Sequence, residues 1–259
     1  MHVVEGPSAK AYAIRITNRF REETVRKIYA RSKKVFIPIE KLVGKRFLKA
    51  DSLGKNILLF FDKIAIRLHL MMFGAIHIHK ISEPLLKPEE RVRLMITGDL
   101  QKLVVYNAPI VEIDNKDKIL ERLKKELGPD PLSSEWDKTK AIKNITKFPD
   151  QKIGAALLDQ SVIAGVGNIL RNEILFRAKV NPERKVADLT QEEIEKIINF
   201  TEQLSKEFLD LKMQGRSIRD LLYVYNRFSG FCRVCGHPIK FYMQKPINRK
   251  TFVCENCQK

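Results

Sequence analysis

The stretch LLDQSVIAGVGNILRNEIL, residues 157–175 of this 259-residue chain, is an apolar helical pattern interrupted by two glycines. An apolar helical pattern reaches Gly165 and Gly167 and resumes directly after them, as in two helices joined by a short glycine turn. Such a turn points the N-terminal amides of the second helix outward, where they can bind a phosphate oxygen. Asn168, at the expected cap position, can add a side-chain donor. A plain helix hairpin with an ordinary asparagine cap fits the turn equally well.

Helical patterns also occupy the rest of this half of the chain, at residues 134–145 and 189–213. In the second of these, Thr190 and Glu193 form a capping box. Apolar residues at helical spacing make one stripe that we expect to be buried, namely Ile194, Ile197, Ile198, Leu204, Phe208 and Leu211. The segment 127–135, LGPDPLSSE, stops the preceding helix and marks a domain boundary. A helical domain therefore follows residue 130.

The first half of the chain has a different pattern. Short β-rich runs at residues 56–61, 64–70, 75–79, 91–97 and 102–106 alternate with polar or turn residues. This arrangement predicts an antiparallel sandwich or barrel. A first helix is expected from Pro7 to about Thr24, because Tyr12, Ile16 and Phe20 recur at helical spacing. The predicted domains are residues 1–130, 131–228 and 229–259, in an α+β multidomain fold.

Two C-x-x-C pairs lie in the last 28 residues and contain all the cysteines of the chain, Cys232, Cys235, Cys254 and Cys257. Eighteen residues separate the pairs, so each pair can form a knuckle and the four thiolates can surround one zinc ion. Four cysteines leave no open position on the metal, which indicates a structural role. His237 is a fifth candidate ligand, but an exposed turn histidine is the favoured interpretation. We expect a reducing compartment rather than a disulfide framework.

The charge of the chain favours a polyanionic partner. Lys and Arg outnumber Asp and Glu by 48 to 31, for a net charge of +17, which favours nucleic acid first and an anionic membrane surface second. The apolar runs are too short for a membrane helix and no signal peptide is recognisable, so we expect an intracellular protein. Residues 239–253, between the knuckles, read as a hairpin with a basic face. Phosphate contact is favoured over a merely solvated face.

Four motifs in this order resemble one family: VEGP at residues 4–7, Gly54-Lys55 before a strand, residues 157–175, and NRKTFVCENCQK at residues 248–259. They are similar to the formamidopyrimidine-DNA glycosylase and endonuclease VIII family over residues 4–259. The resemblance implies an N-terminal antiparallel β-sandwich with flanking helices, a C-terminal helix-two-turn-helix domain and a zinc-finger hairpin, with DNA bound between the two parts. The implied activity is that of a bifunctional DNA glycosylase and AP lyase of base excision repair.

The resemblance implies a role for each matched residue. Val4 corresponds to the nucleophile, whose α-amine forms a Schiff base with the sugar C1′, and Glu5 to the proton donor. Lys55 corresponds to a hairpin lysine at the phosphate of the lesion, although a surface lysine is the commoner case. Asn168 corresponds to a phosphate-binding asparagine, and Arg249 to a zinc-hairpin arginine that grips the backbone and takes part in the second elimination.

An α-amine suits this chemistry because its pKa is about 7.7–8.0, against about 10.4 for lysine, so more of it is nucleophilic at neutral pH. Glu5 beside it can act as a general acid. Gly6 lets the DNA backbone approach closely, and Pro7 starts the helix that holds the pair. If Val3 acylates Val4, however, the nitrogen is an amide and cannot form a Schiff base.

We therefore expect that translation starts at Val3, with the initiator residue trimmed, or that residues 1–3 are an addition to the natural chain.

The residues 69–74, HLMMFG, stand where the family carries an apolar wedge that fills the space left by a flipped base. Met71, Met72 and Phe73 are the candidates, and burial in the sandwich is the alternative. His69 either touches phosphate or packs in the core. His77 and His79 are expected to be ordinary strand residues.

Two missing features favour the endonuclease VIII branch of the family. The segment YNAPIVEI at residues 106–113 lacks the Arg-Phe pair of the formamidopyrimidine branch, and residues 215–231 are too short for a long loop over 8-oxoguanine. We therefore expect oxidised pyrimidines such as thymine glycol as substrates, with 8-oxoguanine or formamidopyrimidine as the alternative.

The expected partner is double-stranded DNA that contains an oxidised base or an abasic site, with no membrane contact. The expected protein is a monomer with one structural Zn²⁺, in the cytoplasm or nucleoid of a prokaryote or in a eukaryotic nucleus. Two other functions remain open: a catalytically silent protein that binds damaged DNA, and a zinc-containing nucleic-acid protein without a role at damage.

Overall fold

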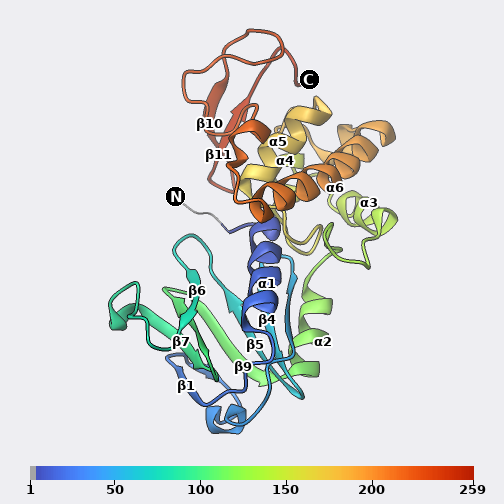
Figure 1. Ribbon diagram of the computed structural model, residues 1–259. Coiled ribbons are helices and arrows are strands. Elements are labelled where there is room, and N and C mark those ends of the chain that lie inside the picture. Colours follow the sequence, from blue (N-terminus) through green and yellow to red (C-terminus); the bar gives the residue numbers. More distant parts are fainter. Residues whose placement is uncertain (1–3) are drawn as a thin grey trace. The chain divides into compact units, whose positions relative to one another are not determined.

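The computed structural model describes residues 4–259, which fold into two compact units that divide after Lys125 (Figure 1). The first unit holds a pair of β-sheets with one long helix, and the second holds helices with a terminal β-hairpin. The predicted α+β class, with the sheets first and the helices second, is confirmed. The three domain boundaries drawn from the sequence remain a prediction.

The first unit is a sandwich of two sheets that share one apolar core. The five-stranded sheet has the order β2-β9-β5-β4-β3, with β2 (Lys34–Val35), β9 (Ile110–Asn115), β5 (Ile64–His69), β4 (Asn56–Phe61) and β3 (Lys49–Leu53). The four-stranded sheet has the order β1-β7-β8-β6, with β1 (Lys27–Ala30), β7 (Val92–Thr97), β8 (Gln101–Tyr106) and β6 (Ala75–Lys80). All neighbours are antiparallel except β2 and β9. Short 3-10 helices cover Ile39–Leu42 and Glu89–Arg91.

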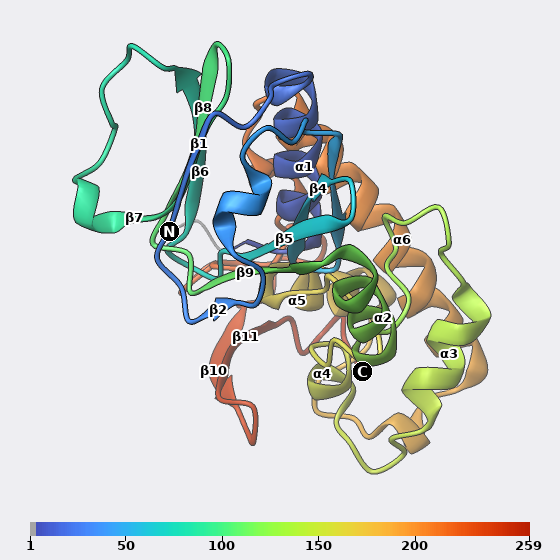
Figure 2. The same ribbon diagram turned by 90° about the horizontal axis from the view of Figure 1, so that it is seen from below.

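Helix α1 (Gly6–Phe20) completes this core (Figure 2). It begins with Pro7 in its first turn, where a missing N–H costs nothing. Ile16 and Phe20 are buried as the helical spacing predicts, and Phe20 meets Phe47 edge to face at 5.5 Å between ring centroids. The helix ends at Phe20, earlier than the predicted Thr24, because Arg21 adopts an extended conformation. One end of this buried helix therefore holds the VEGP segment in place.

The second unit follows α2 (Lys116–Glu126), which ends where the segment 127–135 is predicted to stop it. Its helices are α3 (Lys138–Thr146), α4 (Ile153–Ala156), α5 (Asn168–Ala178) and α6 (Gln191–Met213), and its hairpin consists of β10 (Lys240–Gln244) and β11 (Arg249–Val253). Two 3-10 helices lie at Val186–Asp188 and Ile218–Leu221. None of the helices in the described part of the chain is long and apolar enough to cross a membrane.

The caps of the second unit follow from single side chains. The capping box of α6 is confirmed: the Thr190 hydroxyl accepts from the Glu193 N–H at 3.2 Å, and the Glu193 carboxylate accepts from the Thr190 N–H at 2.8 Å. Helix α3 begins at Lys138, later than the predicted residue 134. The reason is that Asp137 caps it, with its carboxylate accepting from the Lys140 N–H at 2.9 Å.

Candidate functional site

The start of α1 fixes the predicted nucleophile and acid. Val4 and Glu5 are both buried, and Glu5 occupies the N-cap position. The Val4 backbone nitrogen donates to the Met71 carbonyl at 3.1 Å, and the Glu5 carbonyl accepts the first helical hydrogen bond, from Ala9, at 3.0 Å. Both residues are thus held by main-chain hydrogen bonds as well as by burial. This places the Val4 nitrogen against the loop that follows β5.

That loop, residues 70–74, carries the three wedge candidates. Met71, Met72 and Phe73 are 45%, 39% and 65% exposed, so the alternative interpretation, burial in the sandwich, is wrong. The loop is tight because the Gly74 N–H donates to the Leu70 carbonyl at 2.9 Å, and a β-carbon on Gly74 would lie 2.8 Å from that residue. Met71 adopts a left-handed φ of 49°. The fold therefore presents three apolar side chains to solvent beside the Val4 nitrogen.

Lys55 and His69 lie at the same end of β5. Gly54 and Lys55 form the turn between β3 and β4, and the left-handed φ of 57° at Gly54 suits glycine. His69 pairs with Asn56 across the strands, directly after Lys55. Burial, followed by the charges of Lys55 and Arg67, lowers the pKa of His69 to about 4. His69 is therefore neutral at neutral pH and does not add a positive charge beside the lysine.

A buried ion network supports this turn, and the sequence analysis missed it. Glu112 is 1% exposed, and its Oε2 accepts from Arg67 Nε at 2.6 Å and from Arg122 Nη2 at 2.9 Å. Arg67 Nη1 also donates to Asn56 Oδ1 at 2.9 Å. Although burial raises the pKa of Glu112, the hydrogen bonds from Arg122 and Arg67 outweigh it and lower that pKa. Glu112 lies in the segment YNAPIVEI, and an acid flanked by the apolar residues Val111 and Ile113 was the signal in the sequence.

In the second unit, the glycine turn precedes α5 as predicted, but the cap assignment is wrong. Gly167 is the N-cap, in an extended conformation, and Asn168 is the first residue of the helix. The turn uses the left-handed φ of 92° at Gly165. The Asn168 side chain points to the terminal hairpin, where its Nδ2 donates to the Lys250 carbonyl at 2.9 Å. Asn168 thus joins the helix start to strand β11 rather than capping its own helix.

Arg171, one turn further along α5, is the largest fully buried side chain and ties the helix to both hairpin strands. Its Nη2 donates to the Lys250 carbonyl at 3.0 Å and to Thr251 Oγ1 at 2.7 Å, and its Nη1 donates to Gln244 Oε1. Thr251 Oγ1 in turn donates to the Arg249 carbonyl at 3.0 Å. A chain of hydrogen bonds therefore runs from Arg171 to the backbone of the predicted phosphate-gripping arginine.

Arg171 and Glu173 were not among the residues predicted from the sequence. The Glu173 carboxylate accepts from the backbone N–H groups of Tyr223, Val224 and Tyr225 at 2.8–3.0 Å. Two opposite charges within the apolar run NILRNEILF were the signal that could have found them, because charges are rarely buried unless they are hydrogen-bonded. Arg249 itself is exposed and borders an open pocket of about 610 Å³, with Gln151, Lys152 and Ile247.

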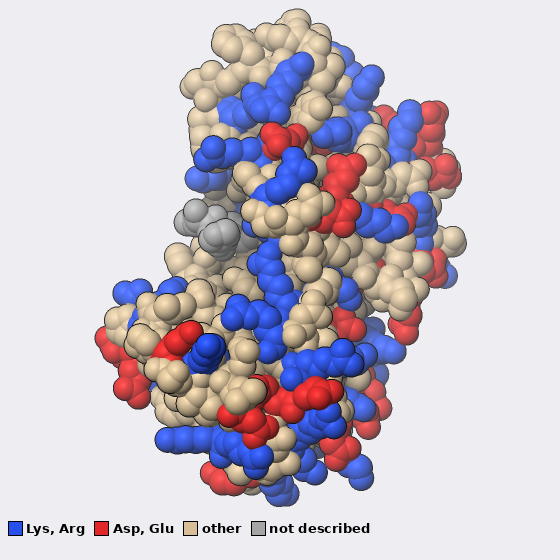
Figure 3. Space-filling model, viewed as in Figure 1, with Lys and Arg blue, Asp and Glu red and all other residues tan. Residues whose placement is uncertain are grey.

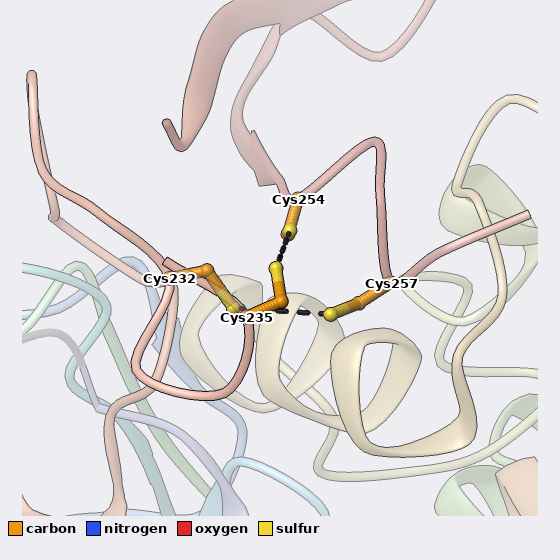
Figure 4. Close-up of side chains that lie close together, drawn as sticks. All are labelled: Cys232, Cys235, Cys254 and Cys257. Carbon is orange, nitrogen blue, oxygen red and sulfur yellow. Dashed lines mark hydrogen bonds between the residues drawn. The ribbon is translucent and has the colours of Figure 1, made fainter. Parts of the chain in front are cut away.

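The four cysteines converge at the base of the hairpin (Figure 4). The sulfur atoms lie within 4.8 Å of one another, with 3.4 Å between Cys235 and Cys254 and 3.9 Å between Cys232 and Cys257. This group could hold a metal ion in a thiolate shell. His237 is exposed and stands outside the group, as the favoured interpretation of the sequence has it.

Positive charge alone does not outline a binding surface. On the face drawn in Figure 3, Lys and Arg side chains appear on both units and are mixed with Asp and Glu. The net charge of +17 raises attraction to any polyanion. The charge on this face therefore does not by itself mark a binding surface.

The chain matches two family models along most of its length. Residues 4–109 match the formamidopyrimidine-DNA glycosylase N-terminal domain, and residues 127–220 match the formamidopyrimidine-DNA glycosylase H2TH domain. The formamidopyrimidine-DNA glycosylase of Listeria monocytogenes is 33% identical over 234 residues, which are 85% of each chain. The endonuclease 8-like 3 protein of Xenopus laevis is 27% identical over 226 residues, which cover 85% of this chain and 36% of the Xenopus protein.

The fold is shared with a solved structure, a complex of Lactococcus lactis Fpg with DNA that contains an abasic site. The two chains superpose with a TM-score of 0.87 at 23% identity, over 98% of this chain and 99% of the other. The family models, the relatives and the fold agree with one another, and the chain therefore belongs to the formamidopyrimidine-DNA glycosylase family, the DNA glycosylases of base excision repair.

Proposed function

We propose that this protein excises oxidised bases from DNA through a Schiff base on the α-amine of Val4, and then cleaves the strand as an AP lyase. The position of the Val4 nitrogen carries the proposal. It lies 3.1 Å from the Met71 carbonyl, beside the buried acid Glu5 and at the end of β5 that also holds Lys55 and His69. The proposed nucleophile Val4, the proposed acid Glu5 and the cation Lys55 thus belong to one part of the first unit.

The proposal requires an active form that begins at Val4, since an amide nitrogen has no available lone pair. The match to the N-terminal family model runs from Val4, which supports this assignment. A free amine has more than one N–H, so one of them can keep the hydrogen bond to the Met71 carbonyl while the lone pair faces a sugar carbon. The main chain then orients the nucleophile without any side chain.

The reaction balances with the groups at hand. The Val4 lone pair forms a bond to C1′ while the bond from C1′ to the base breaks, and the proton that the nitrogen then loses is passed through solvent to the departing base. Glu5 protonates the ring oxygen and the sugar ring opens, which leaves the nitrogen and C1′ joined as an iminium ion that acidifies the C2′ hydrogen. Its removal expels the 3′ phosphate in a β-elimination, and a δ-elimination then expels the 5′ phosphate. Lys55 and Arg249 are proposed to bind the phosphates that depart.

The second unit supplies the grip in this proposal. Asn168 Nδ2 uses one hydrogen on the Lys250 carbonyl and keeps a second for a phosphate oxygen. Arg249 is exposed at the start of β11, in the terminal hairpin.

We assign one structural zinc ion to Cys232, Cys235, Cys254 and Cys257, because four thiolates suit the tetrahedral preference of zinc. When bound, the ion holds the two knuckles together. The exposed Met71, Met72 and Phe73 are the proposed wedge for the space left by the flipped base.

The proposed substrates are oxidised pyrimidines in double-stranded DNA. The support is the absence of an Arg-Phe pair from residues 106–113 and the short interval 215–231. The second candidate is excision of 8-oxoguanine or formamidopyrimidine, which the name of the Listeria relative favours. Single-turnover rates on duplexes with thymine glycol and with 8-oxoguanine opposite cytosine decide between them. Faster release of 8-oxoguanine would reverse the assignment.

Borohydride trapping separates the enzyme from its alternatives. The protein is incubated with a duplex that contains thymine glycol or an abasic site, as in the solved Lactococcus complex, and the imine is reduced. A covalent adduct supports the enzyme. Tight binding without an adduct supports a silent protein that binds damaged DNA. If the protein forms no adduct and does not bind tightly, a zinc protein without a role at damage is supported. The expected compartment is the one that holds the DNA, a nucleoid or a nucleus.

A further inference from the structure

The terminal hairpin has two faces of opposite character. On one face, Gln244 and Thr251 are buried and bind Arg171. On the other, cross-strand pairing places Phe241 opposite Phe252 and Met243 opposite Lys250. Phe241 and Met243 are each 40% exposed. Since residues two apart in a strand share a face, the exposed Phe241, Met243 and Lys250 make one outer surface over the buried Phe252.

A loop residue extends this surface into an aromatic platform. Phe228, 46% exposed, meets Phe241 at 4.8 Å between centroids and Phe252 at 5.0 Å, in both cases edge to face. Phe252 is 1% exposed and forms the floor, with its N–H bound to Asn172 Oδ1 at 2.8 Å. The Lys250 ammonium lies 5.4 Å from the Phe228 ring centroid. We call Phe228, Phe241, Met243 and Lys250 the hairpin platform.

The charged side chains around the hairpin platform are mostly positive. Residues 227–259 contain seven Lys or Arg and a single acid, Glu255, which pairs with Lys240 at 2.7 Å. An apolar surface with a cationic border suits a partner that offers flat apolar groups and negative charge together. Stacked bases linked by phosphates have this combination, whereas an acidic peptide would not require exposed ring faces.

We propose that the hairpin platform binds single-stranded DNA, with unpaired bases on Phe228 and Phe241 and a phosphate near Lys250. The platform uses the face of the hairpin opposite to the one that packs on Arg171, so it is separate from the phosphate contacts proposed above. The rings are already held by Phe252, and binding therefore costs little side-chain entropy. The function is additional to base excision and requires neither Val4 nor Glu5.

The test is fluorescence anisotropy with the whole protein and a labelled 20-nucleotide dT strand. Phe228→Leu/Phe241→Leu keeps apolar contact with Phe252 but removes the ring faces. We expect it to bind dT about tenfold or more weakly than the wild type, since stacking on an aromatic ring contributes about 1–3 kcal/mol per base. Affinity for an undamaged duplex should change less than twofold, and the thermal melting temperature should stay the same.

Two controls separate stacking from charge. Phe36→Leu removes a phenyl ring that is 61% exposed in the first unit, and it should leave dT affinity unchanged. A 20-unit strand of abasic spacers keeps the phosphates without the bases. We expect the wild type to bind this strand as weakly as the double variant binds dT. Equal wild-type affinity for both strands, or full dT affinity in the double variant, would overturn the proposal.

A spectroscopic readout tests the position directly. Phe241→Trp places an indole on the hairpin platform of a chain whose native tryptophan is Trp136 alone. Saturating dT should quench the added fluorescence, while the abasic strand and the wild-type protein should show no comparable change. Binding of dT without quenching would place the strand elsewhere and overturn the proposal.

Discussion

The two units hold their candidate functional groups by different means. In the first unit, main-chain hydrogen bonds place the two residues: the Val4 nitrogen donates to the Met71 carbonyl, and the Glu5 carbonyl accepts from Ala9 at the start of α1. In the second, a buried side chain, Arg171, and the cysteine group place the exposed Arg249. Side-chain substitutions in the second unit should therefore weaken the grip on DNA and leave the chemistry intact. In the first unit, the proposed chemistry depends on the Glu5 side chain and the Val4 nitrogen.

The largest expected effect is that of Glu5→Gln, which removes the proposed acid and keeps its shape. Base release from thymine glycol should slow by about 100-fold to 10,000-fold, the usual range for a general acid. Affinity for the same duplex should change less than threefold. Single-turnover kinetics and anisotropy measure the two quantities, with the exposed Glu22→Gln as the control. Equal losses of base-release rate and duplex affinity would contradict the assignment of Glu5 to the chemical step alone.

Cys254→Ser tests the metal part of the grip. The variant loses one of four sulfur ligands, so metal affinity should fall by more than about 100-fold, beyond the usual cost of losing a residue that only supports a ligand. Affinity for damaged duplex should fall with it, because Arg249 lies on the hairpin between the knuckles. Metal analysis after dialysis and anisotropy report these losses. His237→Ala should keep its metal, and a fully loaded Cys254→Ser protein would contradict the assignment.

Arg171→Met tests the hydrogen-bond chain. It removes the donor to the buried Gln244 Oε1 and Thr251 Oγ1 and one of the donors to the Lys250 carbonyl, so the second unit should lose about 3 kcal/mol of unfolding free energy. Trp136, packed on the core of this unit, reports the transition in denaturant. Arg177→Met is the matched control, because that guanidinium stacks 3.9 Å from the Tyr223 ring centroid and should contribute about 1 kcal/mol.

Trapping at an abasic site under saturating DNA should proceed within threefold of the wild-type rate in Arg171→Met. A rate loss as large as that of Glu5→Gln would show that the two units do not divide chemistry from grip.

The smallest expected effect concerns His69. Burial and the charges of Lys55 and Arg67 lower its folded pKa to about 4, against 6.5 unperturbed. The folded state therefore binds this proton less readily than the unfolded state, and stability falls as pH drops from about 6.5 to about 4. The loss should be about 2 kcal/mol once solvent screening of the partly exposed ring is included. Denaturation of the wild type and His69→Asn across this range measures it. Identical pH profiles would contradict the shift.

Five strands of the first unit were predicted correctly from the pattern of apolar and polar residues. Strand β4 covers residues 56–61 as predicted, because the five residues after Asn56 are apolar and the strand lies between β5 and β3 with every residue buried. The runs that became β5, β6, β7 and β8 were also found within one residue. Strands β1, β2, β3 and β9 were not predicted, since these strands are short or contain many polar residues. Most of them pair with strands that are distant in sequence.

The site could be predicted only where local pattern decides geometry. The C-x-x-C spacing located the cysteine group, and the glycine turn located α5. The predicted cap position of Asn168 was wrong, because its side chain instead binds the Lys250 carbonyl, 82 positions away, and its phosphate-binding role stays a prediction. The buried positions of Arg171 and Glu112 were not predicted for the same reason. Their hydrogen-bond partners belong to other elements, and a single sequence does not show which distant groups come into contact.

The most direct test of the proposed chemistry compares two forms of the protein, one that begins at Val4 and one that retains residues 1–3. Both are incubated with an abasic duplex and borohydride, and peptide mass spectrometry locates the adduct. We expect the form that begins at Val4 to carry the reduced sugar on its α-nitrogen, and the longer form to give none. An equally rapid adduct on the longer form, or one on a lysine in both, would contradict the assignment of Val4 as the nucleophile.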